Sequence, residues 1–240
     1  MHEVDGKLYY FGESGQIYKN QSITIEDGVN YYCDSNGIAI SMENNSWFET
    51  NGNYLYVKDG VILKMRVEKI GDFYYGFGYD GVRYTDASFD FRDSESQRWI
   101  YYRAKSDGTL YVNEWYTSKY GDVYYYGEGG KAYSGLHEID GIQYYFNDSG
   151  EIYKNRGITT EDGEIYYCDS NGKAIKIEAN GWFEVDGKYL YIKDGKFLTN
   201  SVAEINGVYY GFDDNGIMYT NTSFSIWDYE NNVNNYYRAK

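Results

Sequence analysis

The chain has 240 residues with a net charge of -15, and it contains 33 Tyr and 28 Gly but no Pro. Seven Leu and eight Ala are too few for a helical bundle. The acidic balance excludes a nucleic-acid partner, which needs a basic face, and no apolar run is long enough to span a membrane. Tyr and Gly instead favour β-strands and tight turns.

The sequence is a tandem duplication. Residues 2–105 align with residues 137–240 at a constant offset of 135 without a gap, and 58 of the 104 aligned pairs are identical. Residues 106–136 lie between the two blocks as a bridging repeat. Because stacked repeats share their core with their neighbours, we expect the three parts to form one continuous solenoid.

A shorter unit recurs inside each block, and it reads Gly-x-x-Tyr-Tyr-aromatic-x-x-x-Gly-x-x-Tyr. Counting looser copies around residues 100–111 and at the C-terminal end, the chain holds about eleven units of roughly 20 residues. The clearer copies run over residues 6–18, 28–40, 52–63, 71–84, 121–133, 141–153, 163–175, 187–198 and 207–219. The longer connections 84–100 and 219–235 are expected to be long units of the same kind.

Each unit predicts a β-hairpin. An aromatic-rich strand is followed by a turn over residues 13–15, 34–37 or 58–60, and then by a short second strand such as 16–18 or 151–153. The Gly in each turn supplies the positive φ that tight hairpin loops require. A single hairpin is not stable alone in water. The predicted fold class is therefore all-β, a solenoid of stacked two-stranded hairpins that share an aromatic core.

Two segments, residues 139–150 and 205–216, resemble the cell-wall-binding repeats of Gram-positive surface proteins, whose unit contains Gly-x-aromatic-Tyr-Tyr-Phe-Asp-x-x-Gly. That group includes choline-binding modules, glucan-binding repeats and the C-terminal repeats of large clostridial toxins. The resemblance implies a non-catalytic module that is extracellular, associated with the cell wall, and bound to a cell-surface polymer. We expect the chain to be the targeting part of a larger secreted protein.

The resemblance also suggests a ligand. In choline-binding modules a Trp stands at the start of each unit, but here it is present only at Trp47, Trp115 and Trp182. Few Trp and mixed unit lengths are more similar to the toxin-type repeats, whose relatives bind carbohydrate. Carbohydrate is therefore the predicted ligand. The alternatives are a choline-binding module on choline-decorated teichoic acid, and a structural stalk or adhesin spacer without a small ligand.

Aromatic side chains are the candidate ligand-binding residues. Their flat faces stack on sugar rings, and when grouped as a cage they attract a quaternary ammonium ion through cation–π interaction. Most rings of a Tyr-rich solenoid fill its core, so we select those on strands with a unit-starting Trp. The predicted ligand-binding residues are Trp47, Tyr54, Tyr56, Trp115, Tyr124, Trp182, Tyr189 and Tyr191, with Trp99 and Trp227 as weaker candidates.

No catalytic constellation stands out, and neither a metal nor a cofactor site is predicted. Paired carboxylates such as Asp213 and Asp214 lie in turns, where Asp serves the backbone. An enzyme would be recognised by a His, Asp or Glu in a pocket without an equivalent in the other block. Cys33 and Cys168 are equivalent at the same offset, and we expect both to be free, buried and several units apart.

Overall fold

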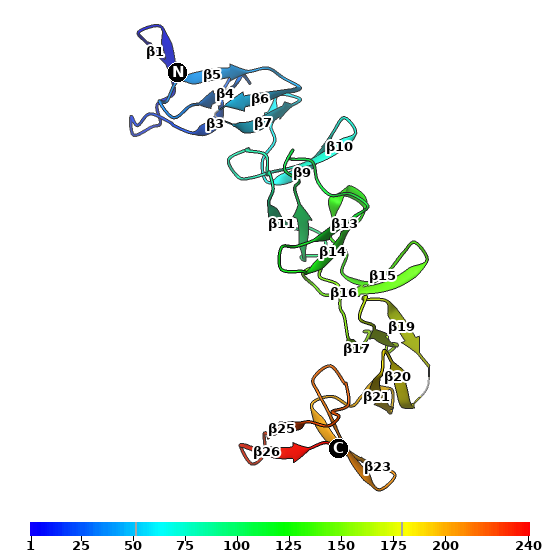
Figure 1. Ribbon diagram of the computed structural model, residues 1–240. Helices are drawn as coiled ribbons and strands as arrows, with labels where there is room; N and C mark the ends of the chain where they lie inside the picture. The colour runs from blue at the N-terminus through cyan, green and yellow to red at the C-terminus, as the bar shows by residue number, and fades with distance from the viewer. Residues whose placement is uncertain (51, 179) are drawn as a thin grey trace. The chain divides into compact units, whose positions relative to one another are not determined.

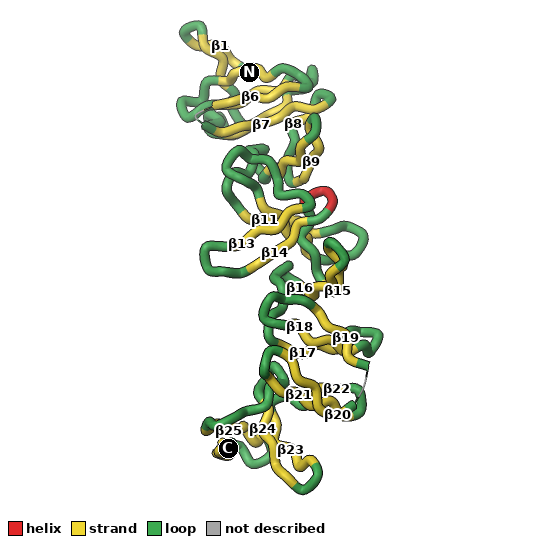
Figure 2. The backbone as a smooth tube through the Cα atoms, turned by 45° about the vertical axis from the view of Figure 1, so that its right-hand side comes forward, coloured by secondary structure: helices red, strands yellow, loops and turns green. Residues whose placement is uncertain are grey.

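The computed structural model describes residues 1–50, 52–178 and 180–240, and its regular structure is almost entirely β-strand (Figure 1). The described residues form eleven small sheets of two or three strands each, and one short 3-10 helix, η1 (Glu128–Gly130). Short loops separate the strands throughout, as Figure 2 shows. The prediction of an all-β chain of hairpins is confirmed.

The chain divides into two compact units, one of residues 1–116 and 125–132, the other of residues 117–124 and 133–240. The strands of the first unit are β1 (His2–Val4), β2 (Lys7–Tyr9), β3 (Gln21–Thr24), β4 (Asn30–Cys33), β5 (Ala39–Met42), β6 (Ser46–Thr50), β7 (Asn53–Lys58), β8 (Val61–Ile62), β9 (Arg66–Ile70), β10 (Phe73–Phe77), β11 (Ser88–Arg92) and β12 (Trp99–Arg103). The hairpin of β13 (Glu114–Thr117) and β14 (Val123–Tyr126) contributes residues to both units.

The strands of the second unit are β15 (Gly135–Ile139), β16 (Ile142–Phe146), β17 (Arg156–Thr159), β18 (Ile165–Cys168), β19 (Ala174–Ile177), β20 (Gly181–Val185), β21 (Lys188–Lys193), β22 (Lys196–Phe197), β23 (Ser201–Ile205), β24 (Val208–Phe212), β25 (Ser223–Asp228) and β26 (Val233–Arg238). The block bounds 2–105, 106–136 and 137–240 stay a prediction from the sequence.

Tight turns of Asp or Asn followed by Gly close several of the two-stranded hairpins. Asp5 and Gly6 join β1 to β2 with φ angles of 51° and 74°, and Asp140 and Gly141 join β15 to β16 with 53° and 78°. Two consecutive positive φ angles give a turn whose twist matches that of the flanking strands. These turns lie before the Tyr-Tyr strand, so the longer hairpin of a unit pairs that strand with the strand preceding it.

The expected turns after the Tyr-Tyr strand are present, but the expected second strands differ between units. The turns over residues 34–37 and 58–60 lead into β5 and β8, and the sheets β3-β4-β5 and β6-β7-β8 are therefore three-stranded. The prediction of a second strand is wrong for residues 16–18 and 151–153, which form isolated bridges instead. After such a turn the chain divides its hydrogen bonds between two hairpins, so it cannot run along either one as a strand.

This division of hydrogen bonds links neighbouring hairpins within each unit. In the first unit, Arg83 N–H donates to Tyr54 O on β7 at 2.8 Å, and the next residue, Tyr84, donates to Gly76 O on β10 at 2.9 Å. The second unit repeats the pattern, because Met218 donates to Tyr189 O at 2.8 Å. These hairpins are thereby bonded to the ones before them, which is the nearest-neighbour contact of a repeat fold.

The buried side chains are shared between hairpins in the same way. Phe77 on β10 is fully buried beside Gly76, and a Cβ on Gly76 would lie 2.1 Å from Cζ of Phe89 on β11. Gly76 therefore lets the ring of the next hairpin pack directly on the backbone. Tyr84 completes this contact by stacking on Phe89 with a centroid distance of 4.1 Å.

Cys33 and Cys168 are free and completely buried, as expected from the sequence. Burial raises the pKa of both thiols above the ordinary value, and that of Cys168 to about 12. Desolvation of the thiolate is the main cause in each case.

The first prediction concerns the shared core. Phe77→Ala should lower the free energy of unfolding by about 3–5 kcal/mol, because it removes a fully buried ring and leaves a cavity. Chemical denaturation followed by circular dichroism measures this loss. The matched control is Phe73→Ala on the same strand, where the side chain is 57% exposed. Equal losses in the two variants would contradict the assigned core.

The second prediction concerns the thiols. At about pH 9 an unfolded cysteine, with a pKa near 8.5, is largely thiolate, whereas the folded Cys168 keeps its proton. Iodoacetamide should therefore leave Cys168 unmodified in the folded protein and alkylate it in concentrated guanidinium chloride, as mass spectrometry would show. By linkage, this raised pKa makes the free energy of unfolding fall as the pH rises from about 8.5 towards 12. Rapid alkylation of the folded protein would contradict this burial.

Candidate ligand-binding sites

Trp47 on β6 is the centre of an aromatic group in the first unit. Its ring lies 5.0 Å from that of Tyr56 on β7, 4.9 Å from that of Tyr75 on β10, and 5.9 Å from that of Phe77. The alternation of β6 places Phe48 on the opposite face, packed against the buried cluster of β4 and β7. Trp47 is still 36% exposed, so its ring is braced by neighbours without being covered.

A cation of the chain itself lies within this group. The guanidinium carbon of Arg83 is 4.5 Å from the ring centroid of Tyr54, 5.5 Å from that of Trp47 and 5.8 Å from that of Tyr75. Distances below about 6 Å are typical of cation–π attraction. We call Trp47, Tyr54 and Tyr75 the first aromatic site. Its geometry holds a flat cation between three rings.

The second unit repeats the arrangement with one difference. Trp182 on β20 lies 5.1 Å from the ring of Tyr191, 4.8 Å from that of Tyr210 and 6.1 Å from that of Phe212. We call Trp182, Tyr189 and Tyr210 the second aromatic site. Trp182 is 42% exposed and Tyr189 is 40% exposed. The position of Arg83 is taken here by Met218, which has no charge.

The bridging repeat has a smaller aromatic pair. Trp115 on β13 is 38% exposed and lies 5.0 Å from the ring of Tyr125, at an interplanar angle of 70°. This matches the contact between Trp47 and Tyr56, so Tyr125 is the structural counterpart of Tyr56. Tyr124 was selected from the sequence, and strand alternation directs it to the other face of β14. Its role in ligand binding stays a prediction.

The two weaker candidates lie apart from these groups. Trp99 on β12 is 56% exposed and Trp227 on β25 is 39% exposed. Neither ring contacts another ring in the part of the chain that the structure describes. Trp99 faces Arg92 across its hairpin, and Trp227 faces Asn234. Single exposed rings of this kind provide one stacking face and no cage.

Four residues of the aromatic sites were not selected from the sequence: Tyr75, Tyr210, Arg83 and Met218. All four come from the hairpin that follows the Trp. Sequence spacing within one unit does not reveal which side chains of the next unit contact that Trp. The duplication did contain a signal. Tyr75 and Tyr210 are identical at the 135-residue offset, whereas Arg83 and Met218 differ directly before the matching residues Tyr84 and Tyr219.

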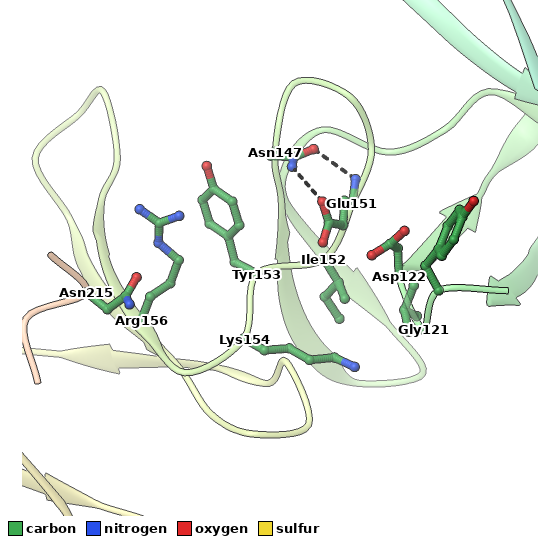
Figure 3. Close-up of a pocket in the computed structure, with 11 residues that line it drawn as sticks. Gly121, Asp122, Asn147, Glu151, Ile152, Tyr153, Lys154, Arg156 and Asn215 are labelled. Carbon is green, nitrogen blue, oxygen red and sulfur yellow. Dashed lines mark hydrogen bonds between the residues drawn. The ribbon is translucent and has the colours of Figure 1, made fainter. Parts of the chain in front are cut away.

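A cavity of about 470 Å³ lies in the second unit, lined by Asp122, Glu151, Tyr153, Lys154 and Arg156 among others (Figure 3). The guanidinium carbon of Arg156 is 4.3 Å from the ring centroid of Tyr153. Figure 3 shows the carboxylates of Asp122 and Glu151 on the side of the cavity away from Arg156. The cavity therefore has charges of both signs.

The two carboxylates of this cavity lack equivalents in the first block, since Glu151 aligns with Gln16 and Asp122 belongs to the bridging repeat. Glu151 Oε2 accepts a hydrogen bond from Asn147 Nδ2 at 3.4 Å, and Asp122 Oδ2 accepts one from Ser118 Oγ at 2.9 Å. Both partners lie four residues earlier, so each carboxylate fastens its own turn.

Turn carboxylates elsewhere also serve the backbone. Asp213 Oδ1 accepts hydrogen bonds from the N–H groups of Asn215 at 2.9 Å and Ile217 at 2.8 Å. Asp169 Oδ1 does the same for Asn171 and Lys173, at 2.8 Å each. The interpretation of these acidic residues as turn residues is confirmed for Asp213.

Comparison with known proteins agrees with this architecture. A family described as a putative cell wall binding repeat matches residues 134–152. Residues 134–152 are thus identified as a cell-wall-binding repeat. Its fold is that of the choline-binding repeat proteins: a structure of choline binding protein F from Streptococcus pneumoniae aligns with 92% of this chain and 86% of that chain, at a TM-score of 0.50 and 18% identity. The family resemblance read from the sequence is confirmed.

Two streptococcal relatives match the repeats by sequence. Glucosyltransferase-S from Streptococcus mutans serotype c (strain ATCC 700610 / UA159) is 27% identical over 148 residues, which are 60% of this chain and 9% of that protein. Glucosyltransferase-I from Streptococcus downei is 28% identical over 135 residues, which are 54% of this chain and 8% of that protein. The repeat chain thus spans less than a tenth of either relative.

No helix in the described part of this repeat protein is long and apolar enough to cross a membrane.

Proposed function

We propose that the chain is the non-catalytic, wall-targeting part of a larger extracellular protein, and that it binds a polymer of the cell surface through its aromatic sites. The second aromatic site is proposed to take the quaternary ammonium group of a choline-decorated polymer. One observation supports this ligand above the others. The same three rings, repeated in the first aromatic site, surround a guanidinium ion at 4.5–5.8 Å.

The physical basis is the negative potential at the face of an aromatic ring. A cation over such a face gains roughly 0.5–2 kcal/mol per contact, more when water is excluded. A guanidinium and a quaternary ammonium share a delocalised positive charge and weak hydration, so a group of rings that holds one is suited to the other. One such contact is weak, but repeated modules on a repeated polymer gain affinity through effective concentration.

Carbohydrate stays the second candidate ligand, with support of a different kind. The two sequence relatives are named glucosyltransferases, and the regions that match belong to the repeats. The exposed rings of Trp47, Trp115 and Trp182 would each give a sugar a flat face to stack on. The alternative of a stalk without a ligand requires these rings to be covered by neighbouring hairpins, and each is more than a third exposed.

The proposal that the chain is not an enzyme has its own support. The relatives named as glucosyltransferases match this repeat chain over less than a tenth of their own length. The carboxylates of Asp122 and Glu151, which lack repeat equivalents, each accept a hydrogen bond within their own turn. A binding module needs neither a nucleophile nor a general base.

The third prediction tests the ligand. Trp182→Ala should weaken choline binding five- to thirtyfold, the effect of losing about 1–2 kcal/mol of ring contact, and shift the thermal midpoint by only a few degrees. Calorimetric titration with choline and, separately, with dextran measures binding, and Trp99→Ala is the control for loss of an exposed Trp outside an aromatic site. Binding of dextran without choline would select carbohydrate. Unchanged choline affinity with a large loss of stability would make Trp182 a core residue.

A further inference from the structure

We infer that Arg83 is a built-in occupant of the first aromatic site, and that the residue at this position decides whether a site is open to an external cation. Arg83 closes the first site, and Met218 leaves the second one open. The inference rests on the proposed function in one respect, namely that the second aromatic site accepts a quaternary ammonium ion.

The contacts of the central Trp are alike in the two sites. The ring contacts of Trp47 and Trp182 with their Tyr neighbours agree within 0.1 Å, at 5.0 and 4.9 Å against 5.1 and 4.8 Å. Arg83 and Met218 also enter their sites through the same backbone bond, each donating to the carbonyl of the Tyr at the site, at 2.8 Å. A side chain exchanged between the two positions therefore starts from the same place.

The charge of Arg83 is matched by rings. Among the described residues its guanidinium forms no salt bridge and no side-chain hydrogen bond, although the chain has 37 Asp and Glu against 22 Lys and Arg. Its Nε is buried and has no hydrogen-bond partner. A buried nitrogen of a guanidinium that has no hydrogen-bond partner is costly unless other groups stabilise its charge. The three rings of the first aromatic site lie 4.5–5.8 Å from the guanidinium carbon and are in position to do so. Asp107 of the following repeat adds a smaller attraction, since the pKa of its carboxyl is lowered first by hydrogen bonds from Thr109 and also by the charge of Arg83.

The following repeat holds Arg83 in this place. A Cβ on Gly108 would lie 2.2 Å from Nε of Arg83 and 2.4 Å from its guanidinium carbon, so the loop backbone packs directly against the side chain. Gly108 is itself buried and has a φ of +85°. The guanidinium therefore contacts both the rings and the Gly108 backbone, and an external cation would have to displace it from both.

Met218 provides no such occupant. Its thioether side chain is uncharged, flexible and polarizable, so it supplies no positive charge to the negative faces of the rings. Trp182 and Tyr189 also remain 42% and 40% exposed. The duplicated chain consequently has one closed and one open copy of the same aromatic arrangement. We therefore expect these two sites to bind one external cation per chain, whereas two open sites would bind two.

The experiment observes each site separately. The indole N–H signals of Trp47 and Trp182 in the ¹⁵N-labelled 240-residue chain are assigned with Trp47→Phe and Trp182→Phe. The chain is then titrated with tetramethylammonium and with choline. In the wild-type protein the Trp182 signal should move with saturation, and the Trp47 signal should stay in place. Arg83→Met should make the Trp47 signal titrate with a Kd within about threefold of that at Trp182.

The reciprocal variant closes the open site. Met218→Arg should weaken binding at Trp182 at least about tenfold, because the new guanidinium competes for the same rings. Arg98→Met, which removes an exposed charge elsewhere, is the control and should leave both signals as in the wild type. Thermal midpoints verify folding, and if Arg83→Met does not fold, Met218→Arg decides the question.

The outcomes separate the two proposals. A Trp47 signal that titrates in the wild type as the Trp182 signal does would overturn the role of Arg83, and so would a Trp47 signal that stays still in Arg83→Met while Trp182 responds. Unchanged binding at Trp182 in Met218→Arg would overturn it as well. A wild-type Trp182 signal that responds to neither cation would instead overturn the proposed ligand, and a response of Trp47 in Arg83→Met would then still establish Arg83 as the occupant.

Discussion

A two-stranded hairpin of five-residue strands cannot bury its own side chains, and this constraint determines the rest of the structure. Each hairpin must share its rings with the next one in the chain. One link between them is a pair of backbone hydrogen bonds, as at Arg83 and Tyr84, in which one residue donates to the preceding hairpin and the next residue donates to its own hairpin. Glycine in the Tyr-Tyr strand, as at Gly76, lets a ring of the next hairpin reach the backbone.

The same joint builds the aromatic sites. The residue that donates to the preceding hairpin, Arg83 or Met218, is brought beside the Tyr whose carbonyl accepts its bond. The next Tyr-Tyr strand brings Tyr75 or Tyr210 to the ring of the Trp. A site is thus always made by two consecutive hairpins, and a single substitution at the joint changes its occupant without disturbing the joint itself.

Much of the fold could be read from the sequence, because repetition makes a weak local pattern strong. The all-β class, the free and buried cysteines and the turn role of Asp213 were all predicted and are confirmed. The prediction of second strands over residues 16–18 and 151–153 is wrong. A turn in the sequence shows where the chain reverses, but it does not show which neighbouring segment the backbone then hydrogen-bonds to. Tyr125 was passed over for Tyr124 because one residue of register reverses the face of a strand.

The sequence by itself determined the unit, its copies, its turns and the Trp at the centre of each aromatic site, because these depend on local pattern and spacing. Only the tertiary structure decided what surrounds each Trp, because the rings of Tyr75 and Tyr210 and the side chains of Arg83 and Met218 arrive from the next hairpin. The exchange of Arg83 for Met218 is a plain difference between two copies in the sequence. In the structure it separates a cage that holds its own cation from one that does not, since cation–π attraction depends on distances that spacing along a chain does not give.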